Sequence, residues 1–376
     1  MNPEEKRSAG ADMIRLAICG IRGTAPGREL VHSMDLAAVR LLSEKHMVSA
    51  VVAMALESAD CGDAWSAREI GKSVRRIALQ DAERAKVIGK LEEAGIWYLP
   101  MKGVVLKELY PRYGMRWMGD QDFLIDPSHA DDVRDIMLGL GYEEMEEPST
   151  TTDGYVKPDI HNFEMHQALF FEVFNRELSQ YYQDVDRRLV ADGDGGLRRR
   201  FTDEDFYVYM TAHAYKHYSS GGIGVRHLLD VCVYVSRFEG RLDWKYIAAE
   251  MEKLGISAFE RLSRGLAMKL YRDAPLSEEE EEMLGFILDS GVYGTFKHSL
   301  SQRLEQLDGS LKGKLKYIRS RLFLPMEYVK AFHPFVYRHR VLLPFLNLWR
   351  LVKALTVYWK AIRPELLGLF RLRKKG

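Results

Sequence analysis

The sequence is poor in cysteine and has no long apolar run. Among its 376 residues, the three cysteines are widely separated in the chain. Such spacing matches neither a disulfide framework nor a zinc site. The longest apolar stretches, such as 341–346, are far shorter than the ~18 residues of a membrane-spanning helix. The N-terminus carries Glu4 and Glu5 where a secretory signal peptide carries basic residues. These absences predict a protein of the reducing cytoplasm.

The chain also lacks an overall excess of either charge. It has 54 basic and 54 acidic residues, so its total charge indicates no polyanionic partner. The balance hides an asymmetry, because residues 310–376 carry 16 Lys and Arg but two Asp and Glu. Their net charge of +14 is offset by −14 in the remainder. The basic tail is therefore expected to favour an anionic membrane surface or the acidic body itself.

The N-terminal region, residues 1–94, combines an irregular segment with helices. Residues 1–30 show no clear apolar periodicity, whereas 33–56 and 64–94 repeat apolar residues at helical spacing. Gly95 is well placed to end the second helical stretch. The apolar content of 47% is enough for a sizeable core, and the length suggests two or three domains.

Residues 95–175 predict a compact β-α-β-α-β unit. Its expected elements are a strand at 96–101, a turn at Lys102–Gly103, a helix at 104–110, a strand at 120–126, a helix at 128–140 capped by Ser128, a strand from 142, a loop at 146–160 and a strand at 162–173. Helices are expected over most of the next region, 176–309. The tail, 310–376, is predicted to be helical and interrupted by prolines. The fold class is therefore α+β, with a small α/β domain between helical segments.

Two aspartates at the start of a predicted strand carry the strongest chemical signal. Asp120 and Asp122 are two residues apart, so a strand directs both carboxylates to one face. Such a pair repels itself unless a cation neutralises it, and Mg²⁺ prefers carboxylate oxygens. Glu164, between two apolar residues of another strand, supplies a third carboxylate. Glu172 has the same setting, but we favour Glu164. Three carboxylates are enough to bind two metal ions for displacement at phosphorus.

Three residues are predicted to contact phosphate. Gly103 lies between a strand and a helix, where backbone N–H groups can approach an anion. Lys102 adds a point charge, and Arg116 can form a bidentate contact, although both can equally be surface cations. His166 is expected either to touch substrate or to be a structural histidine.

The downstream helices carry a histidine pair with several interpretations. His213 and His217 are four residues apart, a spacing that can bind zinc, although lining the substrate pocket or packing is favoured. Asp230 is expected to pair with Arg226.

For the tail, helices that pack on the acidic body are favoured over a membrane-surface helix, and no nucleic-acid motif accompanies the charge.

The motifs together resemble a known family. The segments GIWYLPMKGVVLKELYP, RWMGDQDFLID and FEMH are similar to the bacterial uncharacterised nucleotidyltransferase family of the polymerase-β-type superfamily, over roughly 35–240. The resemblance implies that Asp120, Asp122 and Glu164 bind metal and that Gly103 lies beside a triphosphate. The superfamily's usual Gly-Ser or Gly-Gly turn is here Gly103–Val104.

The resemblance implies a function. We expect a cytoplasmic, Mg²⁺-dependent enzyme that moves a nucleoside monophosphate from a nucleoside triphosphate to a hydroxyl of an unidentified acceptor and releases pyrophosphate. Two magnesium ions are expected. The alternative is an inactive scaffold that binds a nucleotide or a partner, in peripheral contact with a membrane.

Overall fold

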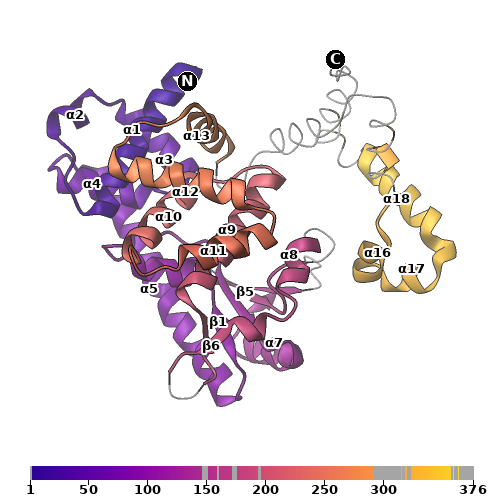
Figure 1. The fold of residues 1–376 in the computed structure, drawn as a ribbon. Coiled ribbons are helices and arrows are strands. Elements are labelled where there is room, and N and C mark those ends of the chain that lie inside the picture. The colour runs from indigo at the N-terminus through magenta and orange to yellow at the C-terminus, as the bar shows by residue number, and fades with distance from the viewer. Residues whose placement is uncertain are drawn as a thin grey trace.

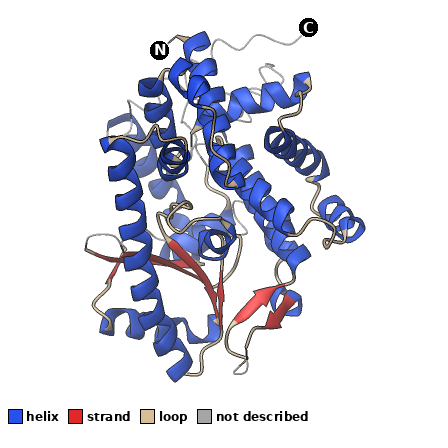
Figure 2. Ribbon diagram, turned by 90° about the vertical axis from the view of Figure 1, so that its left-hand side faces the viewer, coloured by secondary structure: helices blue, strands red, loops and turns tan. Residues whose placement is uncertain are grey.

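The computed structural model describes residues 2–145, 151–158, 161–171, 176–193, 196–291, 315, 318–319, 323–356, 359 and 363. Helices dominate these residues, and a small mixed sheet lies toward one end of the body (Figures 1 and 2). The structure is thus α+β, as predicted.

Five helices build the N-terminal part of the body. They are α1 (Pro3–Arg22), α2 (Arg28–Ser33), α3 (Leu36–Lys45), α4 (Ser49–Ser58) and α5 (Ala64–Glu93). The prediction of irregular structure over residues 1–30 is wrong for α1. Asn2 and Glu5 form a capping box at its start, and Gly23 ends it in the left-handed conformation, φ 67°. Capping thus defines both ends of a helix that buries Met13, Leu16, Ala17 and Ile21 at helical spacing.

The other N-terminal expectations agree with the structure. The helical pattern of 33–56 is divided between α3 and α4, because the chain turns at Met47, where φ is 54°. The pattern of 64–94 is the single long helix α5, and Gly95 follows it with φ 71°. A positive φ suits glycine, which has no side chain to clash, so the helix ends there.

The sheet has the order β1-β2-β5-β4-β3 and contains one parallel pair, β2 and β5. Its strands are β1 (Tyr98–Pro100), β2 (Gln121–Ile125), β3 (Glu143–Glu144), β4 (Thr152–Lys157) and β5 (His161–His166). Its short helices are α6 (Gly103–Leu106), η1 (Lys107–Leu109), η2 (Pro127–His129) and α7 (Ala130–Gly139). Two local predictions are wrong. Strand β4 occupies part of the expected loop 146–160. The side chain of Asp126, not that of Ser128, caps the start of the helical segment, at η2.

The two faces of the sheet have different partners. Phe123 on β2 and Phe163 and Met165 on β5 are fully buried in a cluster with apolar residues of α5 and α7. The intervening residues, among them Asp122 and Glu164, point to the opposite face because successive strand side chains alternate. The buried face therefore fixes which way the carboxylates point.

Helices cover the carboxylate face. The chain continues through α8 (Arg176–Tyr181), η3 (Val185–Arg188), β6 (Leu189–Ala191), β7 (Arg199–Phe201), α9 (Asp203–Ser220), α10 (Val225–Arg237), α11 (Trp244–Lys253), α12 (Ser257–Arg272) and α13 (Glu278–Ser290). Helix α1 contacts α10, α12 and α13, so both helical regions share one buried cluster.

The C-terminal helices lie to one side of this body and contact it at Phe171 (Figure 1). They are α16 (Met326–Phe332), α17 (Pro334–Arg338), η4 (Arg340–Leu342) and α18 (Leu343–Thr356). The ring of Phe332 contacts that of Phe171, with centroids 5.5 Å apart. Within the described part of the chain, none of the helices combines the length and apolarity required to span a bilayer.

Candidate functional site

The predicted carboxylates lie on one pair of adjacent strands. In the parallel pairing of β2 with β5, Asp122 is directly opposite Glu164. Asp120 comes one residue before β2, two residues from Asp122 and toward the same face. Asp122 is only 3% exposed, whereas Glu164 is half-buried. The two strands thus bring together acids that are more than 40 residues apart in sequence. Glu172, the other acid considered for this role, lies outside the described residues.

His166 links this acidic group to the next strand. Its Nε2 lies 3.0 Å from Asp122 Oδ1 and 3.4 Å from Glu164 Oε2. Its Nδ1 lies 3.0 Å from the hydroxyl of Thr152 on β4. One ligand atom from each of Asp122, Glu164 and His166 lies within 4.8 Å of the others. The donor set of two carboxylates and one imidazole suits a divalent cation.

Lys102 gives Asp122 a second partner. Its ammonium pairs with Asp122 Oδ1, and its backbone adopts φ 48°, a conformation that favours glycine. Burial alone would lower the pKa of Lys102, but the facing carboxylate of Asp122 raises it above its usual value. Burial alone would likewise raise the pKa of Asp122, yet Lys102 and His166 hold it well below its usual range. Asp122 is therefore an anion surrounded by cationic or hydrogen-bonding groups.

Asp120 has a different electrostatic environment. Asp120 is exposed by surface area but lines the cavity, where desolvation and repulsion from Asp122 raise its pKa to about 6, despite the opposing effect of Lys102. Glu164 also raises it. A carboxyl group held near like charges gains its ionised form when a cation enters the group. Asp120 is thus repelled by the neighbouring carboxylates, but it is not one of the three residues whose ligand atoms lie within 4.8 Å of one another.

Gly103 opens α6 at the edge of the cavity. A Cβ added there would lie 2.9 Å from Met118 Cγ and 3.0 Å from its sulfur. The absence of a side chain thus lets Met118 pack against the turn. This packing is a structural reason for glycine that the sequence pattern alone does not reveal.

Arg116 lines the cavity but has a buried partner. Its Nε and Nη2 donate to the two carboxylate oxygens of Asp230 at 2.7 and 2.8 Å. Its Nη1 donates to the carbonyl of Trp117. Asp230 also accepts a hydrogen bond from Tyr110 at 2.8 Å. The expectation that Asp230 pairs with Arg226 is thus corrected, because Arg116 and Tyr110 occupy its oxygens. Arg116 was predicted to form a bidentate contact with phosphate. In the structure it forms a bidentate contact with the carboxylate of Asp230.

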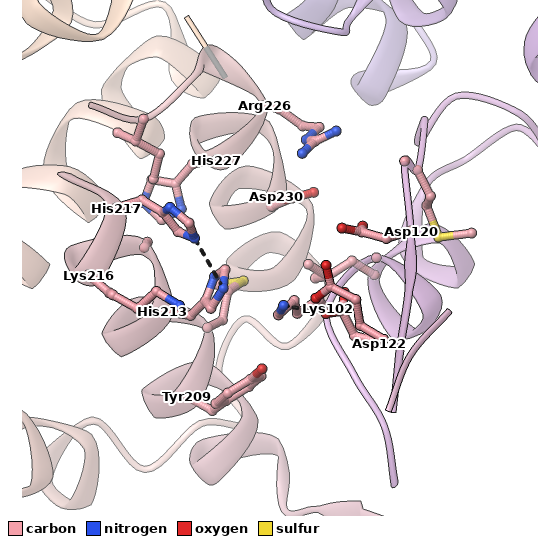
Figure 3. Close-up of a pocket in the computed structure, with 18 of the residues that line it drawn as sticks. Lys102, Asp120, Asp122, Tyr209, His213, Lys216, His217, Arg226, His227 and Asp230 are labelled. Carbon is pink, nitrogen blue, oxygen red and sulfur yellow. Dashed lines mark hydrogen bonds and ion pairs between the residues drawn. The ribbon is translucent and has the colours of Figure 1, made fainter. Parts of the chain in front are cut away.

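One cavity of about 540 Å³ collects all nine residues singled out from the sequence. Its lining includes Lys102, Gly103, Arg116, Asp120, Asp122, Glu164, His166, His213 and His217. Its size is in the range of small-molecule sites. Figure 3 shows Lys102, Asp120 and Asp122 on one side and side chains of α9 on the other. The sheet and the following helices therefore each form one wall.

The helical wall contributes two cations that were not predicted from the sequence to line the site. Lys216 on α9 and Arg226 on α10 line the cavity, and neither pairs with a carboxylate among the described residues. Burial and the neighbouring ammonium of Lys102 lower the pKa of Lys216. Burial and Arg116 lower the pKa of Arg226 to about 10. Only the helical spacing of Lys216 from His213 could have indicated that this lysine shares their face.

His213 and His217 are partners of each other. Their Nε2 atoms are 3.3 Å apart, one donating to the other. Desolvation in the cavity and nearby lysines lower the pKa of both rings, that of His217, which is exposed by surface area, to about 4. Among the described residues, Asp122, Glu164 and His166 form the group of three with metal-ligand spacing, and that group does not include the histidine pair.

The comparisons with known proteins give one match. The model of the family described as "Uncharacterised nucleotidyltransferase" matches residues 33–272, which include both walls of the cavity. Neither the curated proteins nor the solved structures contain a match. Since the matched region is more than half of the chain, the protein belongs to the uncharacterised nucleotidyltransferase family.

Proposed function

We propose that this protein is a Mg²⁺-dependent nucleotidyltransferase that moves a nucleoside monophosphate from a nucleoside triphosphate to an acceptor hydroxyl. The observation that carries the proposal is the placement of Asp122 directly opposite Glu164 on adjacent strands, with Asp120 in the same cavity. Lys216 and Arg226 line that cavity and, among the described residues, form no ion pair with a carboxylate. The family match supports transfer of a nucleotidyl group. The acceptor is defined here only by its chemistry, as a hydroxyl.

Asp120, Asp122 and Glu164 would hold the metal, with His166 beside them. The donor set fits Mg²⁺ because it is rich in carboxylate oxygens, and the raised pKa of Asp120 reflects a negative cluster that a cation would relieve. We propose two ions. When bound, they would neutralise charge on the reacting phosphate and favour ionisation of the acceptor hydroxyl.

The remaining residues position the substrates. Lys216 and Arg226 offer positive charge to phosphate oxygens across the cavity from the carboxylates. Lys102, at the turn before Gly103, can exchange Asp122 for a phosphate oxygen when the carboxylate binds metal. Arg116 supports this wall through Asp230, so we assign it a smaller part in phosphate binding than its sequence position indicated.

The bond changes define the reaction. The acceptor oxygen forms a bond to the α-phosphorus as the bond from that phosphorus to the bridging oxygen breaks. Pyrophosphate leaves with the electron pair of the broken bond, and the hydroxyl proton passes to Glu164 or to solvent. The half-buried position of Glu164 gives it access to both the metal ligands and an entering acceptor.

A second function is favoured by two specific observations. The ammonium of Lys102 already neutralises Asp122 within the protein, and Val104 replaces the small or hydroxyl residue that usually follows Gly103 in the superfamily. Both features fit a scaffold that binds a nucleotide without reacting. This scaffold would bind nucleoside triphosphate but would not release pyrophosphate.

Transfer from an α-labelled nucleoside triphosphate distinguishes the two functions. The full chain is incubated with Mg²⁺, each of the common nucleoside triphosphates and fractions of a cell lysate as acceptors. We expect labelled product together with pyrophosphate. Asp120→Asn and Asp122→Asn should each lower the rate by about 100-fold or more, because each removes negative charge from the metal ligands.

Asp153→Asn is the matched control, because Asp153 is on β4 beside the site and bonds to Gln167 outside the cavity. It should keep the rate of the unchanged protein. Binding of nucleoside triphosphate with no labelled product in any fraction would support the scaffold. Product formation that survives both aspartate substitutions would refute the assignment of the carboxylates.

A further inference from the structure

Exposed apolar side chains are concentrated in the C-terminal helices. Of the 15 large apolar side chains that are exposed among the described residues, ten belong to the stretch from Leu315 to Trp359. The body, which is several times longer, contributes only the other five. Scattered single side chains of this kind are normal on a protein surface, whereas a concentration marks an interaction site.

On α18 four of the five exposed side chains of this kind form a continuous stripe, whereas Leu351 lies on another face. Phe345, Leu348, Trp349 and Val352 are 69%, 58%, 54% and 52% exposed. Their spacing of i, i+3, i+4 and i+7 places them on one face of the helix. A helix that packs against the acidic body would bury this face. The interpretation favoured from the sequence, a tail that packs on the body, therefore does not describe α18.

Positive charge lies beside the stripe. Lys353 Nζ is 4.7 Å from the centre of the Trp349 ring. Arg338 and Arg340 are exposed and, among the described residues, make no ion pair with a carboxylate. In the sequence, residues 310–376 have a net charge of +14. The partner of the stripe must therefore offer both an apolar interior and negative charge.

We infer that the stripe of α18 docks on the surface of an anionic lipid membrane. Apolar side chains enter the boundary between headgroups and acyl chains, while neighbouring lysines and arginines contact the headgroups. The ring of Trp349 suits this boundary because its body is apolar and its N–H is polar. The body, with a net charge of −14 over residues 1–309, would be repelled from the same surface, which orients the protein with its tail toward the lipid.

A second copy of the chain is a weaker occupant. Pairing two stripes would bring two segments of +14 together, and like charges oppose such a contact. In the part of the chain that the structure describes, no helix is long and apolar enough to span a bilayer, so the contact is inferred to be peripheral. The inference is independent of the nucleotidyltransferase proposal, because none of the residues involved lines the cavity.

Flotation with lipid vesicles tests the inference on the full chain. The protein is mixed with vesicles of phosphatidylcholine alone or with vesicles that also contain phosphatidylglycerol. We expect binding to the second kind, reduced by added salt. The double substitution Leu348→Gln and Trp349→Gln should lower the partition coefficient about tenfold or more, because it removes apolar area from the stripe.

Leu41→Gln provides the matched control, because Leu41 is 62% exposed on α3 of the body. It should leave vesicle binding unchanged. Circular dichroism and light scattering accompany each variant. Equal binding of the stripe variant and the unchanged protein, or no binding to phosphatidylglycerol vesicles, overturns the inference. A dimer that the stripe substitutions dissociate would also overturn it and assign the surface to a second copy.

Discussion

Asp122 and Asp230 are both buried, and each neutralises a cation on the cavity wall. Asp122 pairs with Lys102 on the sheet side, whereas Asp230 holds Arg116 by two hydrogen bonds. The first pair can be exchanged for substrate, since Lys102 has a flexible stem and the pair is next to the carboxylates. The second pair is more rigid, because the planar guanidinium fits both oxygens of Asp230 and Tyr110 adds a third bond. Similar charges thus have different roles according to their partners.

Removal of Asp230 should therefore destabilise the fold. Asp230→Ala leaves the guanidinium of Arg116 and the hydroxyl of Tyr110 without their buried acceptor. We expect the free energy of unfolding to fall by about 3–5 kcal/mol, measured by urea denaturation. The double substitution Arg116→Met and Asp230→Leu should recover part of this loss, because it removes both buried charges.

A matched comparison is provided by Asp203→Ala, since Asp203 pairs with Arg241 on the surface. That substitution should cost about 1 kcal/mol or less. If Asp230→Ala has an equally small effect, Arg116 is held by other contacts and its role as a structural cation is incorrect.

At the scale of elements, His46 joins three parts of the helical body. It follows α3 at the turn into α4 and is fully buried. The backbone N–H of Val225, at the start of α10, donates to Nδ1 at 3.3 Å. The ring proton is therefore on Nε2, which donates to the carbonyl of Leu288 on α13 at 3.3 Å. Protonation of Nδ1 would place its N–H against the N–H of Val225, and the hydrogen bond between them would be lost.

This arrangement predicts a dependence of stability on pH. Burial and the adjacent Lys45 lower the pKa of His46 from 6.5 to about 4. Between these values the unfolded chain binds a proton that the folded chain does not, so acid favours unfolding. The stability is unaffected by this group above the unfolded pKa and falls as the pH decreases toward 4. The loss through His46 should be on the order of 1–3 kcal/mol.

The measurement is the melting temperature as a function of pH. With His46→Gln, about one proton fewer should be bound on unfolding between pH 4 and 6.5, so the stability should depend less steeply on pH. The substitution should also lower the stability at neutral pH, because the hydrogen bond from Val225 is lost. His32→Gln is the control, since His32 is exposed on α2 and should leave the curve unchanged. An unaltered curve for His46→Gln would show that other groups cause the pH dependence.

Elements with a strong local signal could be predicted from the sequence, and the others could not. The long helix α5 and strands β2 and β5 follow from apolar periodicity and alternation. Helix α1 was missed because the glycine, proline and charged residues of 1–30 obscured the helical spacing of Met13, Leu16, Ala17 and Ile21. Strand β4 was missed because it pairs with β5 through residues such as Gly154, opposite Glu164, whose local preference is not extended. Pairing with a neighbouring strand overrides local preference there.

At the scale of the whole molecule, the sequence predicted the members of the site better than their partners. Asp120, Asp122 and Glu164 were found because each carries a strand pattern of its own. The ion pair of Arg116 with Asp230 joins residues more than 100 positions apart, and no local pattern specifies it. Lys216 was overlooked for the same reason, because only the folded chain places α9 across the cavity from the sheet. The packing of distant helices thus determines the second wall.

The same division of the molecule predicts what happens when the tail is removed. The two clusters of buried apolar residues are formed by residues up to Leu288, and beyond Gly291 the described residues add only Val329 to the buried set. A chain that ends at Gly291 should therefore fold, with a melting temperature within about 3 °C of the full chain in a calorimetric scan. It should keep nucleotidyl transfer, because every residue that lines the cavity precedes Gly291, and it should lose binding to phosphatidylglycerol vesicles.

A shortened chain that is unfolded would contradict the separation of tail and body. One that folds but still binds the vesicles would place the membrane contact on the body, where the excess of acidic residues makes it physically unfavourable.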